Sequence, residues 1–379
     1  MADRETELSV RLAPGVAAID AGAWDRLAGS DPFLSHAFLS ALEDSGSVGP
    51  GTGWTPAPII IEDETGALAA AAPAYLKTHS QGEYVFDHGW ADAYQRAGGQ
   101  YYPKLQIAVP FTPVPGPRLL GHFPQQLLAA AEAVTVQNGL SSAHITFLND
   151  AGAAECDRRG WLIRHGIQYH WHNRGYGSFD DFLAALTSRK RKAIRRERAA
   201  ARDGLEFAAL AGSAIGAAEW DAMWAFYQDT GSRKWGQPYL TRAFFDRIGE
   251  ELGDRLLLLL AYRDGRPIAG ALNLVGPDII YGRYWGTIEE VPFLHFELSY
   301  YQAIEWAIEH RLSSVQAGAQ GEHKLARGYE PVISRSAHFL ADPGLRQAVA
   351  TYLGGERAAI AAEAEWERAA LPYRAASSG

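Results

Sequence analysis

Hydrophobic residues repeat with helical spacing near the start of each half of the chain. In the first half an amphipathic stretch runs from Trp24 through Phe33 and Phe38 to Leu42, and in the second half apolar residues recur at mostly three- and four-residue steps from Trp220 to Phe245. This periodicity predicts amphipathic helices. Both segments begin with the dipeptide Trp-Asp, which is a first indication that the two halves are related.

Each helical segment leads into two apolar runs separated by a turn. Runs at residues 59–61 and 67–75 flank Glu-Asp-Glu-Thr-Gly, and runs at 256–262 and 267–275 flank Arg-Asp-Gly-Arg. A short polar segment with Gly between β-rich runs is typical of a hairpin turn. We therefore predict a β-hairpin in each half.

A helix and a strand complete the pattern in each half. Residues 123–138 and 296–311 each have one apolar face, and both are followed by Leu-Ser-Ser. Short apolar runs come next, at 143–147 and 315–319. Because the order helix, hairpin, helix, strand occurs twice, we predict two tandem copies of one fold.

The repeat predicts an α/β (α+β) protein of two domains, each with a mixed, largely antiparallel central sheet flanked by helices. We place the first domain at residues 1–175 and the second at 176–340, and a length of 379 residues agrees with this division. Residues 341–379 are expected to form a helix packed on the first domain. About 24 residues have no counterpart in the second half and fall at 79–102. This insertion lacks clear periodicity, and we predict an irregular functional loop there.

Charge is distributed unevenly along the chain, which carries 35 basic and 44 acidic residues and a formal net charge of −9. Residues 189–202 hold eight basic side chains and one acidic one, so the remainder carries −16. We predict one basic helix over 179–202 that binds anions such as phosphates through its cations. The residues expected to do so are Arg191, Lys192, Arg195 and Arg196. The acidic remainder argues against broad contact with a DNA duplex.

The sequence also predicts a cellular location. The first residues, Met-Ala-Asp-Arg-Glu, are charged and lead into no apolar segment, and the longest aliphatic run is 256–260. Cys156 is the only cysteine. We therefore expect no secretory leader, no membrane insertion and no internal disulfide, and a cytoplasmic protein.

Candidate chemical groups concentrate between residues 281 and 331. The predicted strand Tyr-Gly-Arg-Tyr-Trp-Gly starts at Tyr281, and a glycine-rich segment with several charged residues follows the last core strand. Loops beyond the carboxyl ends of strands are where α/β sheets bind ligands. We predict catalytic residues in this region: Glu297 or His323 as proton acceptor, and Lys324 as stabiliser of developing negative charge.

Other residues are expected to bind the substrates. In the second half these are Arg283, Tyr284, Trp285, His295, Glu322, Arg327 and Tyr329. In the insertion they are Asp87, His88, Trp90 and Tyr94. The chain has no Gly-x-Ser-x-Gly motif, no phosphate loop of the Gly-Lys-Ser/Thr type and no recognised spacing of metal ligands, so we expect no covalent nucleophile and no metal.

Several motifs resemble those of one protein family, the FemAB-like predicted N-acyltransferases of bacteria, which are classed with the GNAT superfamily. The motifs are Phe-Asp-His-Gly-Trp-Ala-Asp-Ala-Tyr at 86–94, Tyr-Tyr-Pro-Lys-Leu at 101–105, Val-Pro-Phe-Thr-Pro at 109–113, Pro-Arg-Leu-Leu at 117–120, His-Phe-Glu-Leu at 295–298 and Gly-Ala-Gln-Gly-Glu-His-Lys-Leu-Ala-Arg-Gly-Tyr at 318–329. The related Fem aminoacyltransferases have two GNAT-like domains and move an amino acid from aminoacyl-tRNA to an amine of a peptidoglycan precursor. The resemblance therefore implies tandem GNAT-like domains and acyl or aminoacyl transfer to an amine, by direct attack without a covalent enzyme intermediate.

The resemblance leaves the donor open between acyl-CoA and aminoacyl-tRNA. GNAT proteins hold the CoA pyrophosphate on a glycine-rich turn before the central helix. The corresponding segments, 112–118 and 289–295, contain prolines or a Glu-Glu pair instead. Two other functions stay open at this stage: a non-catalytic protein that binds a glycopeptide or another anionic ligand, and an RNA-associated factor that acts through residues 189–202.

Overall fold

The computed structural model describes residues 8–235, 238–318 and 321–374, which form two compact units. Unit 1 contains residues up to Gly166 together with Ile333–Ala361, and unit 2 contains Ile167–Val332 together with the residues from Ala362 onward. Strands β9 (Leu162–His172) and β15 (Glu330–Leu340) and helix α12 (Pro343–Ala369) therefore each contribute to both units.

Unit 1 has two groups of hydrogen-bonded strands. The first has the order β1-β3-β4-β7, and the second the order β15-β8-β6-β5-β2. These strands are β1 (Ser9–Leu12), β2 (Trp54–Pro56), β3 (Ile59–Glu62), β4 (Leu68–Ala72), β5 (Ala74–Lys77), β6 (Lys104–Ile107), β7 (Leu120–Gly121) and β8 (Ser142–Leu148). The predicted strand at 67–75 is divided into β4 and β5 at Pro73, because proline has no N–H to donate to a ladder.

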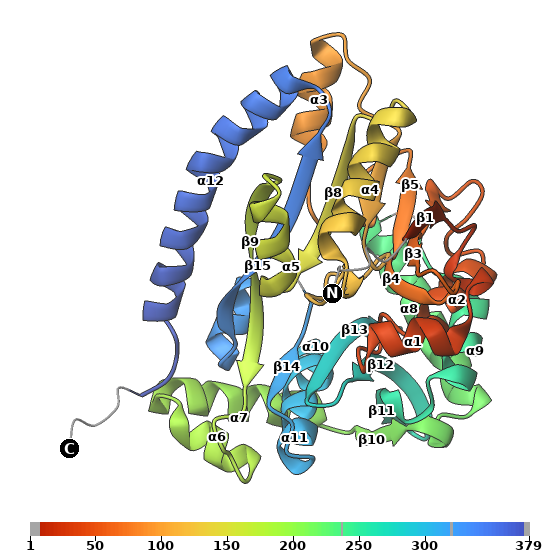
Figure 1. Ribbon diagram of the computed structural model, residues 1–379. Helices are drawn as coiled ribbons and strands as arrows, with labels where there is room; N and C mark the ends of the chain where they lie inside the picture. Colours follow the sequence, from red (N-terminus) through yellow and green to blue (C-terminus); the bar gives the residue numbers. More distant parts are fainter. Residues whose placement is uncertain (1–7, 236–237, 319–320, 375–379) are drawn as a thin grey trace, which may run out of the picture. The chain divides into compact units, whose positions relative to one another are not determined.

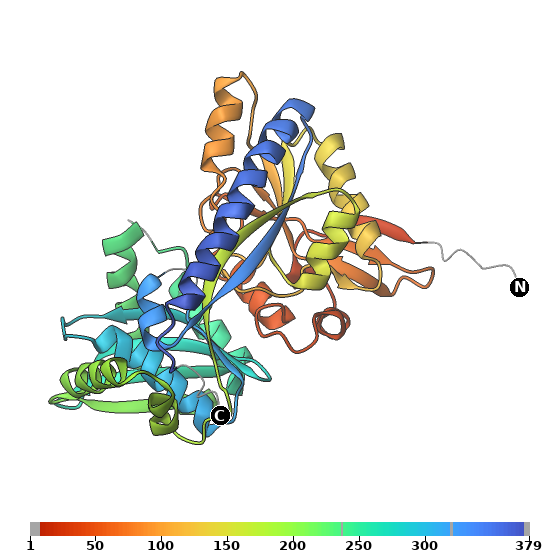
Figure 2. The same ribbon diagram turned by 90° about the vertical axis from the view of Figure 1, so that its left-hand side faces the viewer.

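The helices of unit 1 are α1 (Ala21–Ala28), α2 (His36–Asp44), α3 (His88–Arg96), α4 (Pro124–Gln137), α5 (Asp150–Arg158) and the first part of α12, with a short 3₁₀ turn η1 (Val16–Ala18). Helices α4 and α5 lie side by side (Figure 1, Figure 2). Leu345, Val349 and Leu353 of α12 pack with Trp90 and Tyr101 in a buried cluster. The insertion at 79–102 is therefore not wholly irregular, since α3 forms inside it and buries Trp90.

Unit 2 is built on one sheet with the strand order β10-β11-β12-β13-β14-β9. Its further strands are β10 (Glu206–Ala211), β11 (Leu256–Arg263), β12 (Arg266–Val275), β13 (Ile279–Thr287) and β14 (Ser314–Gln316). Strands β11 and β12 form the predicted antiparallel hairpin, and its turn places Asp264 and Gly265 at positive φ. In the described part of unit 2, the ladders from β10 to β9 are antiparallel except for the parallel β13–β14 pair.

The helices of unit 2 cover both faces of its sheet. They are α6 (Phe179–Ala185), α7 (Ser188–Arg202), α8 (Ala217–Trp235), α9 (Arg242–Glu251), α10 (Leu294–Phe296), a π-helical turn η4 (Glu297–Tyr301) and α11 (Gln302–Glu309), with 3₁₀ turns η2 (Gly212–Ala214), η3 (Gly253–Arg255) and η5 (Glu322–Arg327). Helix α11 packs on β13 and β14 (Figure 1). Ile280, Ile304 and Val315 meet in the main core on that side.

The prediction of one continuous basic helix over 179–202 is wrong. Two helices, α6 and α7, are separated at Leu186, whose backbone is extended. Leu186 is fully buried and forms a β-bridge with Tyr373. Burial of this side chain and the bridge therefore end α6, and Thr187 is the N-cap of α7, which starts at Ser188.

The two units repeat one arrangement, as the sequence pattern predicted. In unit 1, β6 and β8 are parallel neighbours joined through α4, and in unit 2, β13 and β14 are parallel neighbours joined through α11. Each parallel pair is preceded by antiparallel strands. The duplicated order of elements is therefore a duplication in three dimensions.

Candidate functional site

In the sheet of unit 2, the pairing of β13 with β14 ends before β13 does. We call the resulting opening, between the end of β14 and the second half of β13, the fork. The two strands pair only from Ile279 with Ser314 to Tyr281 with Gln316. Strand β14 ends at Gln316, whereas β13 continues to Thr287. Within the described chain no strand pairs with this edge of β13 beyond Tyr281, so the second half of β13 faces an opening in the sheet.

A distorted helix start lies over this fork. Phe293 has a left-handed backbone (φ 63°), α10 is a single turn, and residues Glu297–Tyr301 form a π-helical turn before α11. Single π-helical turns are frequent at functional sites because they change the direction of side chains within a helix. Here the segment contributes His295, Ser299 and Tyr300 to the wall of a cavity.

The cavity has a volume of about 120 Å³ and lies between the fork and this helix start. It is lined by Ala271, Leu272, Asn273, Gly282, Arg283, Tyr284, Trp285, His295, Ser299, Tyr300, Ala317 and Gly318. Asn273 is fully buried, and among the described residues its Oδ1 atom and the Oγ atom of Ser299 have no hydrogen-bond partner. Buried polar atoms without partners are rare in folded proteins, so these two atoms are suited to bind a polar ligand.

Lys324 places a buried amine beside the cavity. Its side chain is 1% exposed, and Nζ donates a hydrogen bond of 2.7 Å to the carbonyl oxygen of Gly318. Burial lowers the pKa of Lys324 to about 7, because the charged form loses its hydration. A large fraction of Lys324 is therefore neutral at physiological pH and able to accept a proton.

His323 and Arg327 are held next to Lys324 by aromatic and polar contacts. His323 Nε2 and the Tyr300 hydroxyl share a hydrogen bond of 2.8 Å, and Arg327 donates to the His323 carbonyl oxygen over 2.7 Å. The Arg327 guanidinium lies 3.4 Å from the ring centre of Phe296 and also donates to Glu197 of α7. These contacts fix the orientation of η5 and hence of Lys324.

Of the residues predicted in the second half, four line the cavity: Arg283, Tyr284, Trp285 and His295. His295 contacts Trp285 at 5.1 Å between ring centres, and Tyr329 is fully buried 5.4 Å from the ring of Tyr300. The side chain of Glu322 lies outside the described part of the structure. Predicted residues from β13 and α10 therefore line the cavity, and those of η5 and the residue Tyr329 lie near it.

Glu297 points away from this group. It is fully buried, its Oε2 accepts from Arg198 over 3.1 Å, and its Oε1 accepts from Arg202 over 2.7 Å. It does not line the cavity. The carboxylate is therefore engaged by two guanidinium groups of α7 and not by the groups around the cavity.

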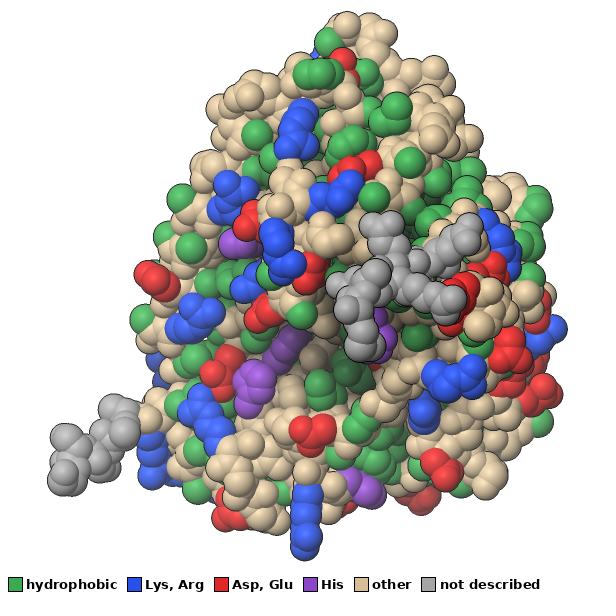
Figure 3. Space-filling view, in the orientation of Figure 1, with side chains coloured by type: hydrophobic (Ala, Val, Ile, Leu, Met, Phe, Trp, Pro, Cys, Tyr) green, Lys and Arg blue, Asp and Glu red, His purple; other side chains and the backbone are tan. Residues whose placement is uncertain are grey.

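The four predicted anion-binding residues lie on α7 and differ in their exposure to solvent. Lys192, Arg195 and Arg196 are exposed and Arg191 is half-buried. Arg195 donates to Asp180 over 2.9 Å. On the face drawn in Figure 3, basic and acidic side chains are interspersed. The helix therefore offers a few exposed cations at its surface.

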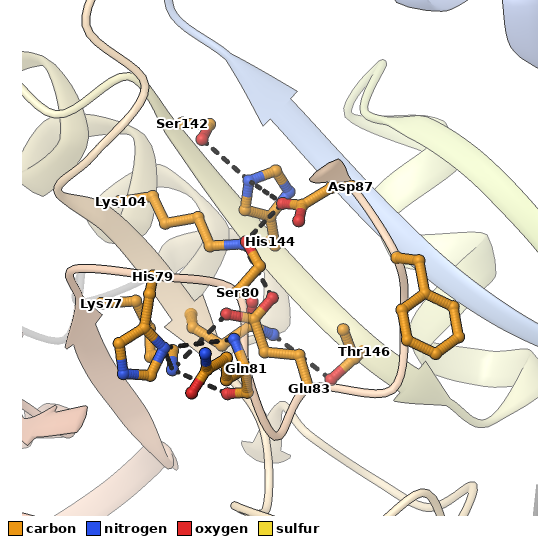
Figure 4. A network of polar contacts seen from close by, with 12 residues as sticks. Lys77, His79, Ser80, Gln81, Glu83, Asp87, Lys104, Ser142, His144 and Thr146 are labelled. Carbon is orange, nitrogen blue, oxygen red and sulfur yellow. Dashed lines mark hydrogen bonds and ion pairs between the residues drawn. The ribbon is translucent and has the colours of Figure 1, made fainter. Parts of the chain in front are cut away.

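The predicted residues of the insertion belong to unit 1. Asp87 and Trp90 are buried, His88 is exposed and Tyr94 is half-buried. Asp87 joins a buried polar network that also contains Lys77, Lys104, Glu83 and His144 (Figure 4). Lys104 is fully buried and donates to Glu83 over 2.7 Å, to Ser80 over 2.8 Å and to Asp87 over 2.5 Å. The network ties the insertion to the start of β6.

Burial and neighbouring charges shift the pKa values of the titratable side chains in this network. Burial raises the pKa of Glu83 to about 7, although the neighbouring lysines oppose the shift. Burial lowers the pKa of Lys77 to about 7, and the charges of Lys104 and His144 hold the pKa of Asp87 well below its usual range against burial. Burial also lowers the pKa of His144 to about 3. His144 and His338 share a hydrogen bond of 2.7 Å between their Nδ1 atoms, so one neutral imidazole donates to the other.

The equivalent fork in unit 1 is occupied by the chain itself. After β6 the backbone returns along β8, where Gly116 forms a parallel bridge with Leu148. Arg118 is nearly fully buried there and donates to the carbonyl oxygens of Val114 and Pro117. The two copies of the fold therefore differ at their forks.

Sequence reasoning missed Lys104, Asn273, Ser299 and His144. A signal existed for Asn273 and His144, because each interrupts an apolar strand sequence, and a polar residue at a core position needs a partner or a ligand. Lys104, at the start of its strand, and Ser299 carry no such signal. Cys156 is buried on α5, and burial raises the pKa of its thiol to about 12, so it is no nucleophile.

Two negative observations apply to the described residues. No helix there combines the length and apolar composition that crossing a bilayer requires. No group of three or more His, Cys, Asp or Glu side chains is arranged there to hold a metal ion.

Solved structures with the same fold include a protein named FemX, at 12% identity and a TM-score of 0.54 over 91% of this chain and 100% of that one. The C-terminal domain of a putative lysylphosphatidylglycerol synthetase from Agrobacterium fabrum matches at 13% identity and a TM-score of 0.51, over 88% of this chain and 95% of that one. A tandem GNAT protein from the clavulanic acid biosynthesis pathway matches at 13% identity and a TM-score of 0.47, over 89% and 99%. The predicted fold class is confirmed: two units with mixed, largely antiparallel sheets flanked by helices, in an arrangement that FemX and the synthetase domain share.

No curated protein matches the sequence. A family model does match residues 15–375, and its description is peptidoglycan biosynthesis/recognition. This match spans both units and includes the fork, η5 and the insertion. The chain belongs to the FemAB-like family.

Proposed function

We propose that this protein transfers an acyl or aminoacyl group to an amine of a peptidoglycan precursor, at the fork of unit 2. The observation that carries the proposal is the pairing of a small polar cavity with the buried amine of Lys324, whose pKa is about 7. Membership of the FemAB-like family supports a transferase of this kind.

The size of the cavity supports a small transferred group. A volume of about 120 Å³ corresponds to roughly four water molecules of liquid. This space suits a short acyl chain or an amino acid, with the remainder of the donor outside. The unpaired edge of β13 beyond Tyr281 offers backbone N–H groups of the kind that stabilise an oxyanion.

In the proposed reaction the neutral acceptor amine attacks the activated carbonyl carbon. A carbon–nitrogen bond forms, the bond to the leaving thiol or hydroxyl breaks, and the proton lost by the amine passes to a base while the leaving group is protonated. Lys324 is better suited than Glu297 to accept that proton, because Lys324 is neutral in large part and Glu297 is held by Arg198 and Arg202. His323, hydrogen-bonded to Tyr300, is the second candidate.

The donor remains a choice between acyl-CoA and aminoacyl-tRNA. Either donor carries phosphates, for which the exposed cations Lys192, Arg195 and Arg196 of α7 and the half-buried Arg191 are suited. Neutralising Lys192 and Arg196 together should raise the KM for the donor and weaken its dependence on salt, with kcat unchanged.

The test combines two measurements on the purified full-length protein. Mass spectrometry of co-purified material identifies a bound CoA thioester, charged tRNA or muropeptide. A muropeptide acceptor is then incubated with each donor class, and mass spectrometry measures the acylated product. We expect product from one donor class and none from the Lys324→Met variant. Binding of the muropeptide without product from any donor would favour a non-catalytic recognition protein instead.

A further inference from the structure

Unit 2 has a second cavity, which lies between α6, α7 and α11 (Figure 1). Its volume is about 490 Å³, within the range of about 300–1,000 Å³ that is usual for small-molecule sites. Among the described residues it shares no lining residue with the cavity at the fork. We call it the α7 cavity, and the proposed transfer reaction does not use it.

One part of the wall of the α7 cavity is apolar. Phe179 and Leu183 of α6 and Ile308 of α11 line it, and all three side chains are buried. Covering apolar surface is favourable by about 25 cal/mol per Å². The α7 cavity therefore offers a place for an aliphatic or aromatic group of a ligand.

The rest of the wall carries equal numbers of positive and negative side chains. They are Arg195, Arg198 and Arg202 of α7, Asp180 of α6, and Glu305 and Glu309 of α11. A purely anionic or purely cationic ligand would meet repulsion from half of these groups. The balance therefore favours a ligand that is neutral overall and carries both charges.

Opposite charges meet directly in this wall. Nη2 of Arg198 donates to Oε2 of Glu305 over 2.6 Å, and the Arg198 guanidinium lies 4.2 Å from the ring centre of Phe179. Within the described chain, no hydrogen bond is made by Nη1 of Arg198, Nη1 of Arg202 or Oε1 of Glu305. Available donors and an available acceptor thus lie close together, beside the apolar surface.

A free α-amino acid with an apolar side chain matches all three features. Its carboxylate and its ammonium group are attached to one carbon atom, as close together as the charges of Arg198 and Glu305. Guanidinium groups form strong charge-assisted hydrogen bonds with carboxylates. The ammonium has three N–H donors, which suit the oxygens of Glu305 and Glu309. The side chain would lie on the apolar part of the wall.

We propose that the α7 cavity binds a free α-amino acid with an apolar side chain. This site is separate from the fork and independent of the proposed reaction. Arg198 and Arg202 also hold Glu297, where the π-helical turn begins. The same turn contributes Ser299 and Tyr300 to the cavity at the fork. A ligand in the α7 cavity therefore contacts the arginines that anchor this turn.

Calorimetric titration of the purified full-length protein, without donor or acceptor, tests the site. The probes are L-leucine and L-phenylalanine. Two analogues of leucine each lack one charge: 4-methylpentanoate has no ammonium group, and 3-methylbutylamine has no carboxylate. L-alanine keeps both charges but lacks the large apolar side chain.

Three variants accompany the wild type. Ala199→Trp fills the α7 cavity, because Ala199 is exposed and lines it. Ala200→Trp is the matched control, since this neighbouring alanine is also exposed but does not line the cavity. Glu309→Gln removes one negative charge from an exposed position in the wall.

We expect wild type and Ala200→Trp to bind L-leucine or L-phenylalanine at least tenfold more tightly than L-alanine and than either leucine analogue. Ala199→Trp should lose this binding and have the same thermal unfolding midpoint as Ala200→Trp. Glu309→Gln should weaken binding of the amino acid severalfold and leave the affinity for 4-methylpentanoate unchanged, because Glu309 faces only the ammonium group.

No binding of either amino acid to wild type, equal affinity for an analogue that lacks one charge, or binding that survives Ala199→Trp would overturn the proposal. Its fate is separable from that of the proposed function. A protein that binds the amino acid without transferase activity retains the site, whereas an active transferase that binds no free amino acid lacks it.

Discussion

The side-chain nitrogen of Lys324 lies 2.7 Å from the carbonyl oxygen of Gly318, a residue of the cavity wall. This contact holds a nearly fully buried amine at the fork of the unit 2 sheet. An uncharged amine at neutral pH is uncommon for lysine, and such shifted groups cluster at functional sites. Lys324 therefore connects the fold of this unit with its proposed chemistry.

Lys324→Met should reduce the rate of acyl transfer by a factor of roughly 10² to 10⁴, the usual contribution of a general base. The wild-type rate should rise with pH through about 7, as Lys324 loses its proton. A pH–rate profile measures both effects. A variant that keeps the wild-type rate and pH profile would exclude Lys324 as the proton acceptor.

The same variant should be more stable than wild type at pH 7. In the unfolded chain lysine stays protonated up to about pH 10.4, whereas in the folded protein Lys324 releases its proton near pH 7. Between these values the unfolded state binds more protons, so stability rises with pH and burial of Lys324 costs free energy at neutral pH. Urea unfolding at pH 7 should show a gain on the order of 1–4 kcal/mol for Lys324→Met. A loss of stability would mean that the amine stabilises the fold.

Glu297→Gln should destabilise the protein without removing its activity. The substitution leaves Arg198 and Arg202 without their shared carboxylate, and breaking a buried ion pair costs about 3–5 kcal/mol. We expect a lower urea midpoint and a kcat within about threefold of wild type at a temperature where the variant is folded. Glu305→Gln is the matched control, because Glu305 contacts the same arginines but is more exposed. A hundredfold fall in kcat for Glu297→Gln alone would make Glu297 the proton acceptor.

Lys104→Met should destabilise unit 1 by about 3–5 kcal/mol, because Asp87 and Glu83 then remain buried without their main cation. Adding Asp87→Asn should recover part of this loss, since one of the two unpaired charges disappears. A double-mutant cycle in urea measures the coupling between the two positions. Strictly additive effects would show that the Lys104–Asp87 contact contributes no net stability.

The linked imidazoles of His144 and His338 should make unit 1 sensitive to acid. Burial holds both histidine pKa values well below the unfolded value of about 6.5. As the pH falls below 6.5 the unfolded chain gains protons that the folded protein does not, so stability falls. At pH 5 this costs about 2 kcal/mol for each histidine. His338→Gln should therefore lose about 2 kcal/mol less than wild type between pH 7 and pH 5 in urea unfolding, and the exposed control His88→Gln should behave like wild type. Equal losses in all three proteins would contradict the linkage.

Local patterns in the sequence were sufficient to predict the duplicated fold. The hairpin turn at Asp264 and Gly265 and the segments that became α4 and α11 follow from spacing and turn chemistry, which act over a few residues. The break at Leu186 was not predictable in this way, because it depends on a bridge to Tyr373, nearly 200 residues away.

The candidate site was predictable only in part for the same reason. Arg283, Trp285 and His295 lie close together in the sequence and meet at the cavity. The pairing of Glu297 with Arg198 joins segments about 100 residues apart, and local patterns carry no record of such a pair. Residue type alone allowed Glu297 to be a proton acceptor, and only its long-range contact with Arg198 shows that it belongs to a buried ion pair.

The most direct test of this account is the rate at which the purified protein acylates a muropeptide amine, followed by mass spectrometry with acyl-CoA and aminoacyl-tRNA as separate donors. The account predicts a single added acyl or aminoacyl group for wild type and Glu297→Gln, and at least a hundredfold slower formation for Lys324→Met. Product formation at the wild-type rate by Lys324→Met, or no product from wild type with either donor, would contradict it.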